Sequence, residues 1–196
     1  MSIAATELSV LHYRSFDDRK IELDPGITVL VGRNAVGKTN LVEALQLLTA
    51  GASFRKPTAS ELLRDGEGSG RIRLMLEGEG RIIEMGLDFS EGKRSFTRNG
   101  KKTRAAGIRG VLPSVLFCPD HLDMVKRSAS RRREALDSFG VQLNENYAKL
   151  LAAYERTVEQ RNNLLRDGYA PGLLEVWDES LATTGAQLLL HRTALL

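Results

Sequence analysis

Residues 32–39 read Gly-Arg-Asn-Ala-Val-Gly-Lys-Thr and fit the pattern G-x-x-x-x-G-K-[ST] in full. A continuous apolar and β-branched run, residues 27–31, precedes this stretch, and residues 40–50 follow it with apolar side chains at helical spacing. The sequence therefore predicts a strand buried on both faces, a glycine-bracketed loop and a helix, in that order. Such a loop binds phosphates, because its backbone N–H groups and the helix N-terminus face them.

Two side chains of this motif are expected to contact the nucleotide and its metal ion. The ammonium of Lys38 would reach the β- and γ-phosphates of a nucleoside triphosphate, and the hydroxyl of Thr39 would be a ligand of Mg²⁺. ATP and Mg²⁺ are therefore the expected cofactors. The expected nucleotide contacts are Gly32, Arg33, Asn34, Ala35, Val36, Gly37, Lys38, Thr39 and Asn40.

Hydrolysis of ATP would also need a carboxylate on Mg²⁺, usually placed after an apolar strand. Residues 114–117 have the pattern of a short apolar strand, and Asp120 follows closely. With Asp120 as a metal ligand, the chain would be a small free-standing P-loop phosphotransferase, which is the alternative interpretation. A third interpretation is a non-enzymatic, nucleotide-dependent DNA-binding module.

The organisation of the rest of the chain follows from its periodicity. The other predicted strands are residues 8–11, 20–23, 71–77 and 81–89, and Asn99-Gly100 predicts a tight hairpin between residues 95–98 and 101–104. The predicted helices are residues 131–139, with Gly140 as a break, residues 144–165, and a returning helix that carries Leu174, Trp177, Leu181 and Leu188. The last two helices are expected to form an antiparallel pair.

Charge is distributed unevenly along the chain. Residues 93–133 hold 12 basic and 2 acidic residues, whereas residues 1–92 and 134–196 are both net acidic. A segment this basic in an otherwise acidic chain favours a polyanionic partner, although a solvated basic loop is the alternative. Lys101, Lys102 and Arg104 are the residues expected to contact DNA phosphates.

Composition excludes several classes of protein. The chain has 196 residues, 42% of them hydrophobic, which argues against wholesale disorder. No apolar run approaches the roughly 18–20 residues of a membrane span, and the N-terminus lacks the pattern of a signal peptide. The single cysteine, Cys118, cannot form an internal disulfide. We therefore expect a cytoplasmic protein without a membrane partner.

The combined motifs resemble the RecF family, the ABC/SMC-like ATPases of bacterial recombinational repair. The likeness covers nearly the whole chain. Besides residues 32–40, the motifs that resemble the family are Tyr13-Arg14-Ser15-Phe16, Ser53-Phe54-Arg55, Phe117-Cys118-Pro119-Asp120-His121-Leu122, Arg131-Arg132-Arg133-Glu134-Ala135-Leu136-Asp137, Gln160-Arg161-Asn162 and Trp177-Asp178.

The resemblance implies a fold and a site. The fold class would be α/β: a P-loop ABC/SMC-like ATPase head lobe, a mixed sheet with an antiparallel ribbon, over residues 1–127, then a helical arm domain over residues 128–196. Arg14 would join the nucleotide contacts. The family's signature motif and Walker B acidic pair are not found in these residues, and the helical pattern continues to the last residue. We therefore expect a part of a longer protein that binds ATP but hydrolyses it negligibly by itself.

The resemblance also implies a biological role. The family binds duplex DNA near junctions with single strands and helps RecO and RecR to load RecA on gapped DNA. It acts in DNA replication, DNA repair and the SOS response to DNA damage. The full-length protein would form a homodimer when ATP is bound.

Overall fold

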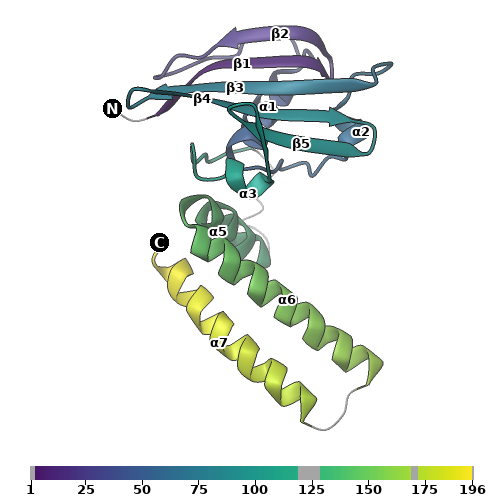
Figure 1. Ribbon diagram of the computed structural model, residues 1–196, viewed down its shortest axis with the longest axis vertical. Coiled ribbons are helices and arrows are strands. Elements are labelled where there is room, and N and C mark those ends of the chain that lie inside the picture. The colour runs from purple at the N-terminus through teal and green to yellow at the C-terminus, as the bar shows by residue number, and fades with distance from the viewer. Residues whose placement is uncertain (1–2, 119–128, 169–171, 196) are drawn as a thin grey trace. The chain divides into compact units, whose positions relative to one another are not determined.

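The computed structural model describes residues 3–118, 129–168 and 172–195 (Figure 1). The chain divides into two compact units, Met1–Leu116 and Phe117–Leu196. The boundary expected between residues 127 and 128 falls in the range 119–128, which lies outside the described residues, so it stays a prediction. No helix in the described ranges combines the length and apolarity needed to cross a bilayer.

The first unit is built on a six-stranded sheet with the order β2-β1-β3-β4-β5-β6. Each pair of neighbouring strands is antiparallel. The strands are β1 (Ala4–Tyr13), β2 (Phe16–Glu22), β3 (Ser69–Gly78), β4 (Arg81–Ser90), β5 (Lys93–Arg98) and β6 (Lys101–Thr103). The strands predicted from residues 8–11, 20–23, 71–77 and 81–89 are thereby confirmed.

The β5–β6 hairpin forms where Asn99-Gly100 predicts it. Both turn residues have positive φ, 49° at Asn99 and 74° at Gly100, as the favoured two-residue hairpin turn requires. The register pairs Arg98 with Lys101 and Thr97 with Lys102. Since side chains alternate across a strand, Lys101 and Lys102 project to opposite faces of this hairpin.

One face of the sheet carries the core. On β3, Ile72, Leu74 and Leu76 are buried and alternate with polar or partly exposed residues, as a sheet with one covered face requires. The helix α1 (Lys38–Thr49) contributes Leu41, Ala44, Leu47 and Leu48 to the same core cluster. Two short helices, α2 (Ala59–Leu62) and α3 (Ala105–Ile108), add Leu62 and Ile108.

Two predicted strands are absent from the described structure. Residues 27–31 and 114–117 are not in strands, and most of their apolar side chains are exposed, 84% for Ile27 and 78% for Val115. A strand buried on both faces needs hydrogen-bonding neighbours and covering layers. No strand among the described residues pairs with either segment, so the strand prediction is wrong for both. The parallel part of the expected mixed sheet is therefore not formed in the described ranges.

The second unit is helical, and its helices are α5 (Ala129–Leu143), α6 (Glu145–Asp167) and α7 (Leu173–Thr193). The helices α6 and α7 run side by side in opposite directions (Figure 1), which confirms the predicted pair. Asn144 caps α6, because its side chain accepts hydrogen bonds from the N–H groups of Asn146 and Tyr147.

A partly buried polar cluster ties the three described helices of this unit together. Asp137 of α5 accepts hydrogen bonds from Nε and Nη2 of Arg192 on α7, at 2.8 and 2.6 Å, and from the hydroxyl of Tyr147 on α6, at 2.5 Å. Burial, together with the hydrogen bond to Asp137, raises the pKa of Tyr147 to about 12. The hydroxyl therefore stays protonated and donates at neutral pH.

Gly140 does not break the helix, contrary to the sequence-based expectation. It lies inside α5, and a Cβ added there would sit 2.7 Å from the ring of Tyr147. Tyr147 is 2% exposed and held by Asp137, so its ring has little room to move. Gly140 is thus a position of close helix packing.

We predict that Gly140→Ala destabilises the protein by about 1–3 kcal/mol, because the clash with Tyr147 outweighs the gain of about 1 kcal/mol in helix propensity. The matched control is Gly185→Ala in α7, where the nearest atom is 3.2 Å away and the propensity gain should leave stability equal or higher. Urea unfolding of both variants is the measurement. Equal stability of the two variants would contradict the packing role of Gly140.

Candidate nucleotide-binding site

The loop of residues 32–37 leads directly into α1. Two of its residues have positive φ, 65° at Ala35 and 104° at Gly37. A Cβ at Gly37 would lie 2.6 Å from the ring of Phe16 and 2.7 Å from the hydroxyl oxygen of Ser15. Only glycine fits this position, because both the backbone conformation and the close approach exclude a side chain. The β1–β2 turn (residues 13–16) therefore packs directly against the end of the loop.

The N-terminus of α1 is left open by the protein's own side chains. Among the described residues, none gives α1 a side-chain cap, and its first turn has no acidic residue. In contrast, Thr58 and Glu61 form a capping box on α2. The first N–H groups of a helix carry a partial positive charge and need acceptors. The open terminus of α1 is therefore suited to an anionic ligand.

The ammonium of Lys38 reaches back to the beginning of the loop. Its Nζ donates hydrogen bonds to the carbonyl oxygens of Gly32 and Arg33, both at 2.7 Å. Thr39, the next residue, is exposed in the first turn of α1. The loop thus combines a cation, open backbone donors and an accessible hydroxyl. These groups fit a triphosphate and its Mg²⁺, and Thr39 would supply the hydroxyl ligand to the metal.

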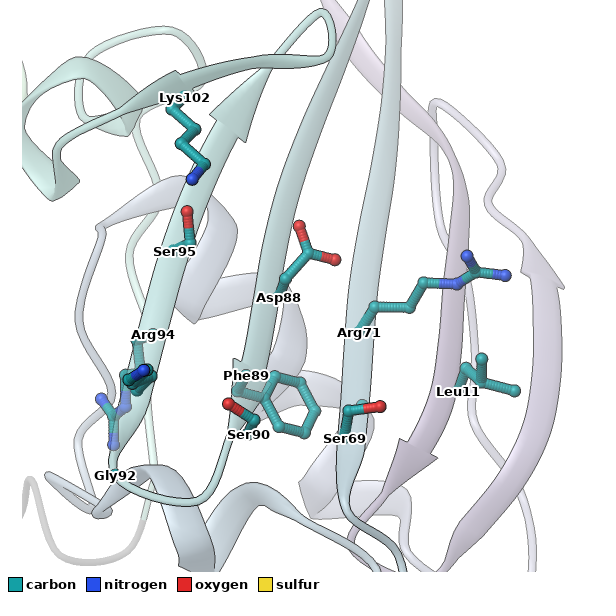
Figure 2. Close-up of a pocket in the computed structure, with 12 residues that line it drawn as sticks. Leu11, Ser69, Arg71, Asp88, Phe89, Ser90, Gly92, Arg94, Ser95 and Lys102 are labelled. Atoms are coloured by element: carbon teal, nitrogen blue, oxygen red, sulfur yellow. The ribbon is translucent and has the colours of Figure 1, made fainter.

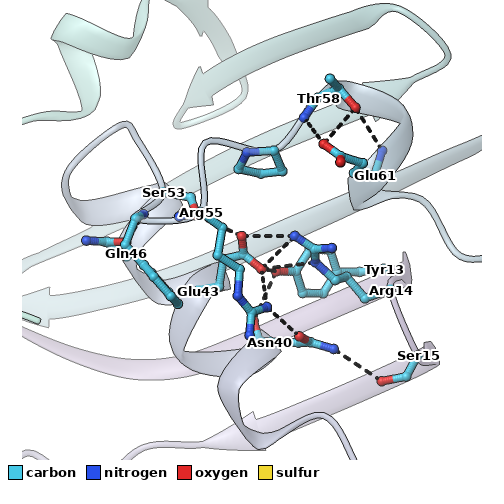
Figure 3. Close-up of polar contacts among 12 residues, drawn as sticks. Tyr13, Arg14, Ser15, Asn40, Glu43, Gln46, Ser53, Arg55, Thr58 and Glu61 are labelled. Carbon is cyan, nitrogen blue, oxygen red and sulfur yellow. Dashed lines mark hydrogen bonds and ion pairs between the residues drawn. The ribbon is translucent and has the colours of Figure 1, made fainter. Parts of the chain in front are cut away.

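A buried carboxylate lies one helical turn after Thr39. Glu43 of α1 is 0% exposed and accepts five hydrogen bonds (Figure 3). The donors and distances are Tyr13 hydroxyl at 3.2 Å, Arg14 Nε and Nη2 both at 3.0 Å, Ser53 hydroxyl at 2.7 Å and Arg55 Nη1 at 3.2 Å. Two guanidinium groups therefore compensate one buried charge.

The partners of Glu43 come from two segments outside α1, one before the helix and one after it. Tyr13 and Arg14 belong to the β1–β2 turn, and burial together with the Glu43 carboxylate raises the pKa of Tyr13 above its ordinary value. Arg55 follows α1 and also donates to the side chain of Asn40, at 2.9 Å. Figure 3 shows these side chains converging on Glu43. The network fixes both segments beside the start of α1.

The structure separates the sequence-predicted site residues into groups. Residues 32–40 form the loop and the first turn of α1. Arg14 makes a two-pronged contact with Glu43, and its contact with nucleotide stays a prediction. Asp120, the metal ligand of the alternative interpretation, lies outside the described residues. The DNA-contacting role of Lys101, Lys102 and Arg104 also stays a prediction.

Sequence reasoning missed Glu43. A single glutamate in an amphipathic helix is ordinarily read as part of the solvated face. The available signal was the pair of arginine motifs, Arg14 and Arg55, which flank the helix in sequence and need a common acceptor. Only the fold shows that Glu43 is that acceptor.

One other cluster has the composition of a metal site. The ligand atoms of His12, Asp17 and Glu67 lie within 4.8 Å of one another. Arg64 Nη1 lies 3.1 Å from the Asp17 carboxylate and 3.9 Å from that of Glu67. The two carboxylates already share a cationic partner, so the cluster is better explained as a surface ion-pair group.

The sheet, the loop and the open helix N-terminus define the P-loop nucleotide-binding class of proteins. Residues 7–167 match the family model described as AAA domain, and the chain belongs to that family. Within this class, the resemblance to RecF is confirmed. The chain is 36% identical over 198 residues to a DNA replication and repair protein RecF of Arthrobacter sp. (strain FB24), and 40% identical over 199 residues to that of Kineococcus radiotolerans.

These matches cover 96% of this chain, and 49% and 51% of the two relatives. The chain therefore spans about half the length of the curated relatives that it matches. A solved structure described as the recombination mediator protein RecF-ATP in the RecFOR pathway superposes with a TM-score of 0.86 at 31% identity, over 98% of this chain and 54% of that one. The Smc head domain of Pyrococcus furiosus, with a TM-score of 0.58 at 17% identity, shows the same α/β ABC/SMC-like head fold.

We predict that Glu43→Gln lowers the free energy of unfolding by about 3 kcal/mol or more, because it leaves two guanidinium groups without their buried counter-charge. Glu7→Gln is the control, since Glu7 pairs with Lys20 on the surface and such pairs contribute under about 1 kcal/mol. Denaturant unfolding measures both. A loss from Glu43→Gln no larger than that of the control would show that the network does not hold the unit together.

Proposed function

We propose that this chain is the ATP-binding head portion of a RecF-like protein of DNA replication and repair. The observation that carries the proposal is the N-terminus of α1, which has no side-chain cap and directly follows the loop. There the Lys38 ammonium donates hydrogen bonds to the carbonyl oxygens of Gly32 and Arg33. The likeness to RecF proteins and to a RecF-ATP structure supports ATP as the nucleotide.

Different groups of the loop and of the first turn of α1 would contact the phosphates and Mg²⁺. Backbone N–H groups at the start of α1 would donate hydrogen bonds to oxygens of the β-phosphate, and Lys38 would exchange its two carbonyl partners for phosphate oxygens. Thr39 would hold Mg²⁺, which supplies charge neutralisation between the phosphates when it is bound. The packing of Phe16 and Ser15 on Gly37 would hold the loop in its binding conformation in the absence of ligand.

We further propose that this chain by itself binds ATP but hydrolyses it negligibly. Glu43 is the carboxylate that α1 brings close to the loop, and it is fully buried and bonded to two arginines. It is therefore unable to activate a water molecule or to ligate Mg²⁺ without breaking the network. Turnover near 1 s⁻¹, at the low end of ordinary enzymes, that disappears in Asp120→Asn would instead favour the phosphotransferase.

The finer role belongs to the same proposal. Duplex DNA and its junctions with single strands would be the nucleic-acid partners, and RecO- and RecR-type mediators the protein partners. The full-length protein would act in the cytoplasm as an ATP-dependent homodimer during gap repair and the SOS response. The names of the relatives, which place them in replication, repair and the RecFOR pathway, support this role.

We predict that Lys38→Ala weakens Mg-ATP binding roughly 10- to 100-fold, the effect of losing a charge-assisted hydrogen bond to phosphate. Lys149→Ala is the matched control, because Lys149 lies in α6 and pairs with Glu145 at the surface. Isothermal titration calorimetry measures both affinities, and circular dichroism checks the fold. The nucleotide assignment fails if Lys38→Ala binds ATP as tightly as the wild-type chain.

A further inference from the structure

The face of the sheet opposite the core carries an open groove of about 860 Å³. Its walls come from β1, β3, β4, β5 and β6, so it lies entirely within the first unit. Figure 2 shows Arg71, Asp88, Ser95 and Lys102 projecting along neighbouring strands of this face. The lining residues are Leu11, Ser69, Gly70, Arg71, Asp88, Phe89, Ser90, Gly92, Lys93, Arg94, Ser95 and Lys102.

The groove has an excess of unpaired positive charge. Within the described ranges, Arg71, Lys93 and Lys102 form no ion pair, and all three are exposed. The one acidic lining residue, Asp88, already contacts Nη2 of Arg73 at 2.6 Å. Three free cations around one neutralised carboxylate give the groove a positive potential, which attracts anions.

The floor of the groove suits a phosphate backbone. Ser69 and Ser90 lie opposite each other in the β3–β4 register, and Ser95 lies opposite Asp88 on β5. Small side chains allow a polymer to approach closely, and hydroxyl groups donate hydrogen bonds to phosphate oxygens. The one aromatic residue among the lining, Phe89, is 2% exposed, so it offers no face on which a base could stack.

We propose that this groove is a track for the phosphate backbone of duplex DNA, bound without sequence preference. This inference rests on the proposed function, because it assigns a surface to the DNA binding proposed there. The proposal also changes which residues are expected to contact DNA phosphates. Of Lys101, Lys102 and Arg104, only Lys102 lines the groove, since Lys101 projects to the opposite face of the hairpin. Arg71 and Lys93, which do line the groove, take the place of Lys101 and Arg104 as the expected phosphate contacts.

The experiment compares two triple variants of the full chain. Arg71→Gln, Lys93→Gln and Lys102→Gln remove the free cations of the groove. Arg98→Gln, Lys101→Gln and Arg104→Gln remove the same formal charge from exposed positions nearby that do not line it. Fluorescence anisotropy measures the affinity for a labelled duplex over a series of salt concentrations, and thermal unfolding confirms that both variants fold.

Each phosphate contact contributes about 0.9 to the slope of log affinity against log salt concentration. The groove variant should therefore lose roughly two to three units of slope and bind at least tenfold more weakly at about 0.1 M salt, while the control loses less than one unit. Loss of slope in the control alone would overturn the groove but leave DNA binding intact. Absence of salt-dependent duplex binding by the wild-type chain would overturn the DNA-binding part of the proposed function itself.

Discussion

A carboxylate without solvent contact is stable only when charge and hydrogen bonds replace the water that it has lost. Glu43 meets this condition through five hydrogen bonds, two of its donors being guanidinium groups. Tyr13 and Arg14 bring in the β1–β2 turn, and Ser53 and Arg55 bring in the segment after α1. One buried charge therefore holds two separate segments of the chain against a single helix.

The geometry of the phosphate loop depends on this arrangement. Because the β1–β2 turn is fixed by Glu43, Phe16 and Ser15 close over Gly37 and leave no room for a side chain there. The loop is thus supported from outside before any ligand binds, and α1 begins with its N–H groups uncapped. Such support lowers the ordering cost that binding would otherwise include. The hydrogen-bond network around Glu43 therefore also supports the phosphate-binding loop.

Local sequence patterns predicted what depends on local rules. The alternation of Ile72, Leu74 and Leu76 and the Asn99-Gly100 turn each follow from backbone geometry and burial on one face. Residues 27–31 were predicted wrongly, because an apolar run shows a preference for burial but not whether partner strands are present. Glu43 and the groove were missed for a related reason. Both depend on residues that only the register and the fold bring together, such as Arg71 of β3 and Lys102 of β6, which line the same groove although two strands separate them.

We propose that Mg-ATP binds the loop of residues 32–39 and that the β1–β2 turn, which is tied to Glu43, becomes more rigid when it does. Amide hydrogen exchange with and without Mg-ATP tests both halves in one measurement. We expect slower exchange at residues 32–39 and at residues 13–16, with little change in the helices of the second unit. Binding of Mg-ATP that leaves exchange at residues 32–39 unchanged would contradict the account.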